Sequence, residues 1–444
     1  MLNLLFSIIL FLGIVCDLGA QVNLNDLYLV SEINTDSIII HDIKILGNKK
    51  TESETILREL KTIPGIVTSK AQLIADEKRV FSLGLFSDVK FYIRQENEKN
   101  YLLIFVRESW YIWPVPFIDI IDRDWKKLTY GLNLSIQNLT GKNDKLSLGI
   151  SFGYDPRFDF NYFHPWIDKK NGLSFFYKFS FQKRKNKSLL AIKDSENYDE
   201  KYILNEVGFG KRFDLYNTFN IHLGFEYVQV PEYLPLRTIS ESGIDRSIIF
   251  QVDYILDTRD FTAYPRKGTN LVLSLRKIGL GESESDYNVF ALELKQIVSY
   301  KNFILFFRNY TRNLSGNVLP YYSNSFIGYK ERIRGHFNHV YEAHSMNVAT
   351  FELRYPLIEQ FLFYFDLLGI PKSLTTYNFS IDFHFFFDSG FMWNNYEIIR
   401  NNKSINGAGF GFSILVLPYR AINFEIGFNS QKKAEFIIDL NNPF

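Results

Sequence analysis

The sequence predicts a mainly β protein, in which one small α+β domain precedes a 16-stranded antiparallel transmembrane β-barrel. Three observations support this fold class. Apolar and polar residues alternate over about sixteen successive segments from residue 110 onward, an even number typical of closed membrane barrels. Aromatic residues make up 17% of the chain, with 43 Phe and 27 Tyr. No segment after residues 1–20 is long and apolar enough to form a transmembrane helix.

The first segment, residues 1–20, predicts a cleavable secretory signal peptide. Its apolar core is too short to span a bilayer comfortably, and small residues follow it at Gly19 and Ala20. An uncleaved anchor and a lipoprotein modified at Cys16 are the less favoured alternatives. Cys16 is the only cysteine, so the mature chain is expected to have no disulfide or thiolate chemistry. Residues 21–37 form a short polar segment after it.

Residues 38–108 predict the small α+β domain. A strand-like run ends in Leu-Gly-Asn, and a helix is expected to start at Thr51, because Glu54 follows at capping-box spacing. A second helix follows the turn at Pro64-Gly65, with a break in its apolar period at Asp76. Two strands joined by a short polar turn complete the order β-α-α-β-β.

Residues 109–444 predict the barrel. In NFEIGFN, Phe424, Ile426 and Phe428 share one face, and the polar residues share the other. A soluble β-sandwich would show the same alternation. However, the polar rows contain Arg, Glu and Lys, which a watery lumen tolerates and lipid does not. Aromatic residues at segment ends are expected to form interfacial girdles: Trp110, Trp113, Phe117, Tyr162, Phe163, Trp166 and Tyr419.

The expected strands are 110–121, 128–138, 144–154, 158–167, 172–184, 201–213, 217–230, 246–259, 268–279, 288–300, 302–314, 348–358, 378–390, 407–417, 421–429 and 434–443. Most joins between them are short. The long joins are 185–200, 231–245, 315–347, 359–377 and 391–406. Long and short joins are expected on opposite rims, which would give the barrel an extracellular and a periplasmic side.

Several function classes are disfavoured by the sequence. A net charge of +1 without a dense basic run gives no case for nucleic-acid binding. GISFG (149–153) matches the G-x-S-x-G hydrolase pattern, but it lies within a strand, whereas a nucleophile elbow needs a strand-to-helix turn. The seven histidines show no metal-ligand spacing. We therefore expect no enzyme activity, no metal and no cofactor.

The chain resembles the BamA/TamA-type superfamily of outer-membrane proteins, also called the bacterial surface antigen family. Residues 38–108 resemble one of its periplasmic POTRA domains. DTRDFTAYPRKGT, RIRG, FFFDSGFMW and the C-terminal Phe444 resemble its barrel motifs, in the family's order. The resemblance covers nearly all of the mature chain. It departs from the pattern at His336, where the family usually has an aromatic residue directly after the glycine.

The resemblance implies that the long loop carrying Arg334, Gly335 and His336 folds back into the lumen. By motif position, Arg334 is expected to pair with Asp388 and with Glu352 on the inner wall. The chemistry agrees, because a guanidinium offers a fixed fork of donors to carboxylates. Gly335 would let the backbone turn tightly beside the wall. Without the motif, a solvated arginine in an exposed loop would be the favoured interpretation.

The resemblance also implies a weakly paired seam between the first and last barrel strands, where a client strand could add. Two prolines in the first strand cannot donate to a ladder, although they could instead end the strand or form a hinge. The expected seam residues are Trp110, Pro114, Pro116, Phe436, Pro443 and Phe444.

These features together predict a protein of the bacterial outer membrane, with the POTRA domain in the periplasm. The expected function is to assist the assembly, insertion or translocation of proteins at that membrane. Its expected partners are outer-membrane lipids, unfolded outer-membrane or secreted clients, and periplasmic or lipoprotein accessory subunits bound through the POTRA domain. The alternatives are a transporter dedicated to one partner polypeptide, a lipid-trafficking barrel and a passive pore.

Overall fold

The computed structural model describes residues 27–33, 35–120, 125–168, 170–193, 197–262, 264–280, 285–336, 339–364, 376–394, 404–417, 420–431 and 433–439. The expected signal peptide lies outside these residues. The chain forms two compact units, one ending at Trp110 and one beginning at Tyr111. No helix among the described residues is long and apolar enough to cross a membrane.

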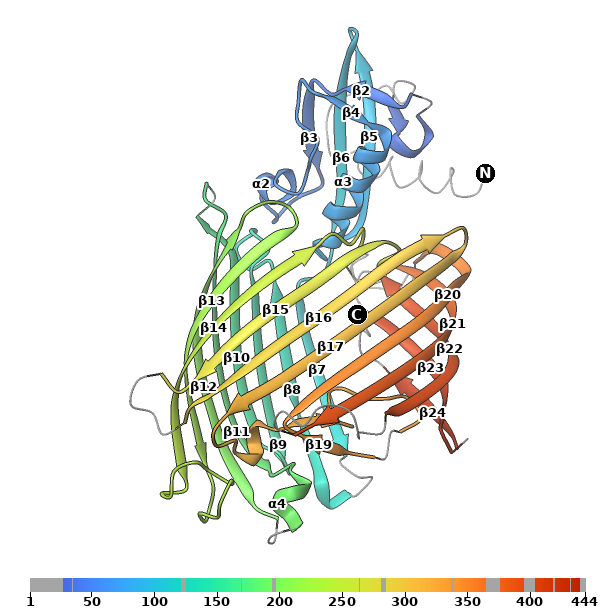
Figure 1. Cartoon of the computed structure of the whole chain (residues 1–444). Helices are drawn as coiled ribbons and strands as arrows, with labels where there is room; N and C mark the ends of the chain where they lie inside the picture. The colour runs from blue at the N-terminus through green and yellow to red at the C-terminus, as the bar shows by residue number, and fades with distance from the viewer. Residues whose placement is uncertain are drawn as a thin grey trace. The chain divides into compact units, whose positions relative to one another are not determined.

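The N-terminal unit is an α+β domain built on a four-stranded sheet in the order β1-β5-β6-β3 (Figure 1). Strand β3 pairs with β6 in parallel, and the other pairs are antiparallel. A second, two-stranded sheet joins β2 to β4. The elements are β1 (Leu27–Leu29), η2 (Val30–Glu32), β2 (Ser37–Ile39), β3 (Asp42–Leu46), α2 (Ser53–Leu57), β4 (Val67–Ser69), α3 (Lys70–Ser82), β5 (Phe86–Glu96) and β6 (Lys99–Glu108).

The expected helix start at Thr51 was wrong. Helix α2 begins at Ser53, and its N-cap residue Glu52 makes no side-chain capping bond. The backbone N–H of Thr51 instead donates to the carboxylate of Glu108, at 2.7 Å. This contact comes from a strand far along the chain, so a local capping pattern could not reveal it.

The break in helical period at Asp76 has a structural explanation. Asp76 is fully buried in α3, and its carboxylate accepts bonds from the backbone N–H groups of Lys61 and Thr62 at 3.2 and 2.9 Å. It also accepts from the Thr62 hydroxyl at 2.6 Å and contacts Arg79. A carboxylate at an inward position therefore ties α3 to the segment that precedes β4.

The second unit contains one sixteen-stranded sheet in which the strands follow one another in chain order (Figure 1). Its strands are β7 (Ile112–Ile120), β8 (Leu128–Gln137), β9 (Lys145–Gly153), β10 (Arg157–Asp168), β11 (Leu173–Lys185), β12 (Asp199–Arg212), β13 (Asn217–Gln229), β14 (Ile244–Asp257), β15 (Gly268–Ile278), β16 (Tyr287–Tyr300), β17 (Phe303–Gly316), β20 (Ser345–Tyr364), β21 (Thr376–Trp393), β22 (Ile405–Leu417), β23 (Arg420–Asn429) and β24 (Ala434–Asp439). The ladders recorded between them are antiparallel, which confirms the predicted fold class.

Short elements lie outside this sheet: η4 (Trp125–Lys127), α4 (Leu189–Lys193), η5 (Tyr321–Ser323) and the hairpin of β18 (Ser325–Ile327) and β19 (Tyr341–Ala343). Helix α4 lies within the long join 185–200. Because successive strands alternate in direction, the join between β20 and β21 falls on the opposite rim from the other four long joins. The expected separation of long from short joins therefore fails at that one place.

The alternation of side chains gives the sheet an apolar outer face. On β13, Ile221, Leu223 and Phe225 are 45%, 53% and 43% exposed. His222 and Glu226, between and beside them, are buried on the other face. Polar residues therefore face the interior, and apolar residues face the surroundings, as a barrel in lipid requires.

Three aromatic residues expected in the interfacial girdle, Trp113, Phe117 and Phe163, belong to the inner row. Phe163 follows Asn161 and Asp159 on the face of β10 that lines an interior cavity. Trp113 pairs with Ser135 and Phe117 with Gly131, so they share a face with Asn133, which lines an interior cavity. A Cβ on Gly131 would lie 2.9 Å from the Phe117 ring. The missing side chain of Gly131 thus makes room for a ring inside the barrel.

Candidate functional site

The guanidinium of Arg334 lies among three carboxylates of the inner wall. Its Nε and Nη2 donate to the two oxygens of Asp388, at 2.7 and 2.8 Å. Its Nη1 donates to Glu352 at 2.9 Å and to Glu425 at 2.8 Å. Asp388 lies on β21, Glu352 on β20 and Glu425 on β23. The structure therefore brings Arg334 together with Asp388 and Glu352, the two residues named from the sequence.

Glu425 was missed in the sequence, although a signal for it was present. It occupies the polar row of NFEIGFN, where an acid on an inward-facing strand position needs a cationic partner. Phe386 was also missed: its ring centroid lies 3.6 Å from the Arg334 guanidinium carbon. The ring and the carboxylates together hold the guanidinium on its face and along its edge.

The acids around Arg334 are bonded to further groups on the wall. Arg354 donates through Nε and Nη2 to Glu352 Oε2, at 2.9 and 2.6 Å. His384 Nε2 lies 2.9 Å from Glu425 Oε1. Arg354 is 1% exposed, so this is an interior network of charges rather than a surface ion pair. Such a network is strongly sensitive to the loss of one partner.

Gly335 allows the loop backbone to lie directly against the wall. Its φ is +92°, a left-handed conformation that favours glycine, and a Cβ there would lie 2.8 Å from the backbone of Phe428. The wall also has a glycine where the loop touches it, because a Cβ on Gly407 would lie 1.8 Å from the Arg334 carbonyl oxygen. His336, next in the loop, bonds through Nε2 to the carbonyl of Asn406 on β22, at 3.0 Å.

A second ion pair holds the same loop, and no sequence motif indicates it. Arg308 on β17 donates through Nη1 and Nη2 to the two oxygens of Glu331, at 2.8 and 3.1 Å. Its Nε donates to Glu293 on β16, at 2.7 Å. Between the two ion pairs, Ile333 is 1% exposed and packs with Ile327, Met346 and Val348. The loop is therefore held at two places on neighbouring strands of the wall, once through its own arginine and once through its own glutamate.

The expected seam has one edge whose hydrogen-bonding groups are incomplete. The N–H of Gln137 donates to the carbonyl of Tyr111, so odd-numbered residues of β7 direct their backbone groups toward β8. Even-numbered residues consequently direct theirs toward the free edge. Pro114 and Pro116 both occupy even positions, and neither has an N–H. Two successive residues whose backbone groups face the free edge of β7 therefore lack an N–H donor.

The other seam residues are placed less completely. Phe436 lies on β24, 65% exposed, and Trp110 precedes the start of β7. Pro443 and Phe444 lie outside the described residues. Within the described ranges, no ladder joins β7 to β24, and these two strands stand at the ends of the sheet order.

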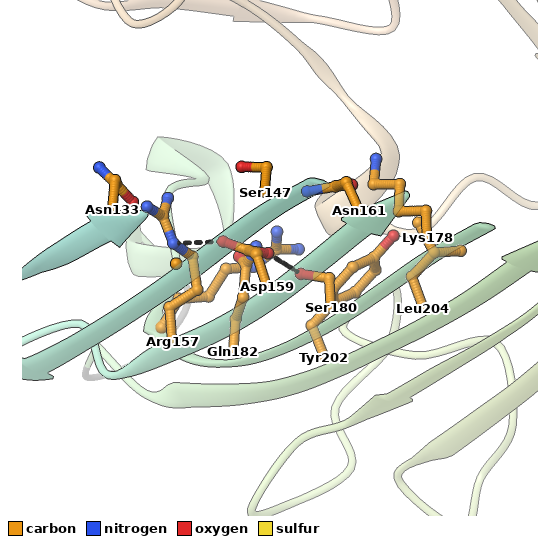
Figure 2. Close-up of a pocket in the computed structure, with 12 residues that line it drawn as sticks. Asn133, Ser147, Arg157, Asp159, Asn161, Lys178, Ser180, Gln182, Tyr202 and Leu204 are labelled. Carbon is orange, nitrogen blue, oxygen red and sulfur yellow. Dashed lines mark hydrogen bonds and ion pairs between the residues drawn. The ribbon is translucent and has the colours of Figure 1, made fainter. Parts of the chain in front are cut away.

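The inner wall of β8 to β12 carries a polar cavity of about 470 Å³. Figure 2 shows Arg157, Asp159 and Ser180 linked in a row along it: Arg157 Nε lies 2.7 Å from Asp159 Oδ2, and Ser180 donates to Asp159 at 2.6 Å. Lys178 and Gln182 extend from the same strand, β11. The lumen therefore presents positively charged, negatively charged and neutral hydrogen-bonding groups to a molecule that occupies it.

Ser151 has an ordinary structural environment. It lies within strand β9, and its hydroxyl donates to the carbonyl of Asp155, at 2.9 Å. In the part of the chain that the structure describes, no three or more His, Cys, Asp and Glu side chains are grouped to hold a metal ion.

An α+β domain followed by a sixteen-stranded antiparallel sheet, with an arginine-bearing loop bound to the polar inner wall, defines the class of POTRA-and-barrel outer-membrane proteins. The profile of the Omp85 superfamily domain matches residues 138–436. The POTRA profile described as surface antigen variable number repeat matches residues 38–109. The chain belongs to the Omp85 superfamily.

Solved structures show the same fold at low sequence identity. The crystal structure of BamA from Haemophilus ducreyi lacking POTRA domains 1–3 aligns with 91% of this chain and 83% of its own, at 15% identity and a TM-score of 0.52. CdiB from Escherichia coli aligns over 91% of this chain and 74% of its own, at 11% identity and a TM-score of 0.55. A comparison with curated proteins gave no match.

Proposed function

We propose that this Omp85 barrel inserts or translocates polypeptides at the bacterial outer membrane through the seam between β7 and β24. Its POTRA domain would lie in the periplasm and contact unfolded clients and accessory subunits. The observation that carries the proposal is the free edge of β7, where Pro114 and Pro116 remove two N–H donors. A complete ladder cannot form there, so part of the opposing strand keeps unpaired backbone groups. An incoming β-hairpin could satisfy those groups by strand addition.

The closing strand supports the same proposal. The N–H of Asn429 donates to the carbonyl of Lys433, so Ala434, Phe436 and Ile438 direct their backbone groups toward the free edge of β24. A strand facing an incomplete edge would separate at lower energetic cost than an interior strand that is paired on both sides.

Locking the seam with a disulfide tests the proposal. The only natural cysteine lies in the expected signal peptide, so cysteines introduced in the barrel would have no competing partner there. Trp113→Cys would be combined in turn with Glu435→Cys, Ile437→Cys and Asp439→Cys. The locked barrel is expected to lose client insertion in proteoliposomes, and reduction is expected to restore it.

The matched control is Ile118→Cys with Tyr130→Cys, which joins β7 to its established partner β8. These residues are opposite one another and form a non-hydrogen-bonded pair, the geometry in which side chains are closest. This control is expected to insert clients normally. Normal insertion by a fully oxidised β7–β24 disulfide would contradict the seam mechanism.

A transporter dedicated to one secreted polypeptide is the second candidate. The polar cavity on β8 to β12 supports it, because an extended peptide passing through the lumen would need such hydrogen-bonding partners. Depletion of the protein distinguishes the two roles. Loss of many outer-membrane proteins would support assembly, and loss of a single exported protein would support dedicated secretion.

A further inference from the structure

A second interior cavity, of about 310 Å³, lies between the wall and the loop that joins β17 to β20. It is lined by four basic side chains and two carboxylates, which leaves an excess of two positive charges. The basic residues are Arg184, Lys187, Arg312 and Lys330, and the carboxylates are Glu200 and Glu331. Four tyrosines also line it. The cavity is therefore positively charged and rich in hydroxyl groups.

Both carboxylates are already engaged. Glu200 Oε2 accepts from Arg184 Nε at 3.1 Å. Glu331 is held by both terminal nitrogens of Arg308, which lies outside the cavity lining. The positive charges of Lys187, Arg312 and Lys330 are consequently not balanced by these acids.

Of these three basic residues, Arg312 gives the clearest evidence of a positive charge that no carboxylate balances. Its Nη1 donates to Ser325 Oγ at 2.7 Å, and among the described residues it forms no ion pair with a carboxylate. A guanidinium has five N–H donors, and a charge removed from bulk water is unfavourable unless it is compensated. Arg312 therefore offers several donors and an uncompensated charge to the cavity.

Lys187 adds a second donor from the segment after β11. Its Nζ lies 5.2 Å from the ring centroid of Tyr329 in the long loop. Partial removal from water and then the neighbouring charge of Arg184 lower the pKa of Lys187 below its ordinary value, although the residue as a whole is exposed. An anion beside it would relieve the repulsion from Arg184.

We propose that this cavity binds a phosphate dianion, either free or as a sugar phosphomonoester. A phosphomonoester carries about −1.5 to −2 charges at neutral pH, which matches the positive excess of the lining. The cavity volume of about 310 Å³ is near the lower end of the range for small-molecule sites and suits a monosaccharide phosphate. Phe326 and Tyr329, whose centroids lie 5.5 Å apart, supply ring surface beside the charged groups. None of the residues that line this cavity belongs to the expected seam.

Calorimetric titration of the full chain in detergent micelles tests the proposal, with glucose 6-phosphate, inorganic phosphate and glucose as probes. Glucose 6-phosphate is expected to bind, and glucose is not. Tighter binding of glucose 6-phosphate than of inorganic phosphate would identify a phosphorylated saccharide as the ligand class, whereas equal binding would identify free phosphate. Failure of both phosphates to bind would overturn the site.

Two variants locate the binding. Arg312→Gln is expected to weaken binding by about ten- to a hundredfold, because it removes charged hydrogen bonds. Lys187→Gln, in a connecting segment, tests the same cavity without altering a barrel strand. The matched control is Lys178→Gln, which removes an exposed lysine on β11 that lines the other cavity. Unchanged binding in a folded Arg312→Gln or Lys187→Gln variant, or an equal loss in Lys178→Gln, would refute the assignment.

Discussion

Arg334 neutralises acids that would otherwise repel one another inside the barrel. The side chains of Asp388, Glu425 and Glu352 are 2%, 4% and 6% exposed, and all three accept hydrogen bonds from this one guanidinium. The bonds leave from Nε and both terminal nitrogens, in different directions. An ammonium group is a point charge and cannot span these positions. The planar fork of arginine is therefore what the site requires.

Arg334→Ala is expected to release the loop from the wall and to destabilise the docked state by about 3–5 kcal/mol, the usual cost of breaking a buried pair. Arg334→Lys is expected to recover only part of this. Limited proteolysis of the loop and thermal unfolding would measure both effects. The control is Arg332→Ala, at an exposed position two residues earlier. A loop as protease-resistant in Arg334→Ala as in the wild type would contradict the anchoring role.

At the residue scale, the sequence predicts a partner only where a motif names it. Asp388 stands in the strand motif FFFDSGF, and Glu352 in the inward row of FELRY. Glu331 and Arg308 lie in no motif, and their pairing depends on how the loop crosses the lumen. That path is set by tertiary contacts such as the burial of Ile333, which periodicity does not encode.

At the scale of the single strand, β7 differs from the interior strands in its backbone rather than in its side chains. Its side chains alternate as the pattern predicts. However, the backbone N–H donors that would point toward its free edge are missing at Pro114 and Pro116. The sequence shows the prolines without showing which way their nitrogens point. The direction became clear only from the hydrogen bond between Gln137 and Tyr111.

Pro114→Val with Pro116→Val is expected to strengthen the seam. Each restored hydrogen bond contributes about 0.5–1.5 kcal/mol, so two of them would lower the open population by about fivefold to a hundredfold. Client insertion should slow correspondingly, and the thermal midpoint of the barrel should rise. Val115→Ala is the control, since the backbone groups of Val115 face β8. Unchanged insertion kinetics in a more stable barrel would show that seam opening does not limit the rate.

Helix α3 of the POTRA domain carries a carboxylate that should make the stability of this domain depend on pH. Glu77 accepts a hydrogen bond from the backbone N–H of Phe91 at 2.9 Å, yet burial raises its pKa above the ordinary value of 4.5. The folded domain therefore binds this proton more tightly than the unfolded chain does. The corresponding stability is complete below pH 4.5 and is lost as pH rises through the folded pKa.

Glu77→Gln is expected to keep the bond from Phe91 and to remove this loss. The variant should be more stable than the wild type at neutral pH, and the advantage should shrink below the ordinary pKa of glutamate. Pulse proteolysis of the POTRA domain in urea, in the full chain, would measure it. Glu96→Gln, at the exposed end of β5, is the control. Identical pH dependence in Glu77→Gln and the wild type would contradict the assignment.

For the molecule as a whole, alternation and motif order were sufficient to predict a sixteen-stranded barrel behind one POTRA domain. The number of barrel strands was predicted correctly because each strand shows its own alternation of apolar and polar residues. The interior arrangement could not be predicted in this way. The hairpin of β18 and β19 and the helix α4 lie in long joins, where the chain has no period and tertiary contacts decide the path, and the second cavity lies between these joins and the wall.

The two sets of ion pairs that hold the loop to the wall, at Arg334 and at Glu331, should also limit ion conduction through the barrel. A loop held at Arg334 and at Glu331 occupies part of the lumen, so wild-type conductance is expected to be low. The double variant Arg334→Ala with Glu331→Ala should show larger and more variable single-channel currents in planar bilayers, and Arg332→Ala should match the wild type. High, steady conductance in the wild type would instead support a passive pore.

The sequence separation of the Arg334 contacts constrains the order in which the barrel can be completed. Its acidic partners lie 18, 54 and 91 residues farther along the chain. During synthesis and export the arginine emerges first, so the loop cannot finish docking until β23 has taken its place beside β22. Docking of the loop thus reports that the wall is nearly complete, and nascent barrels that stall earlier would display an undocked loop to quality-control proteases.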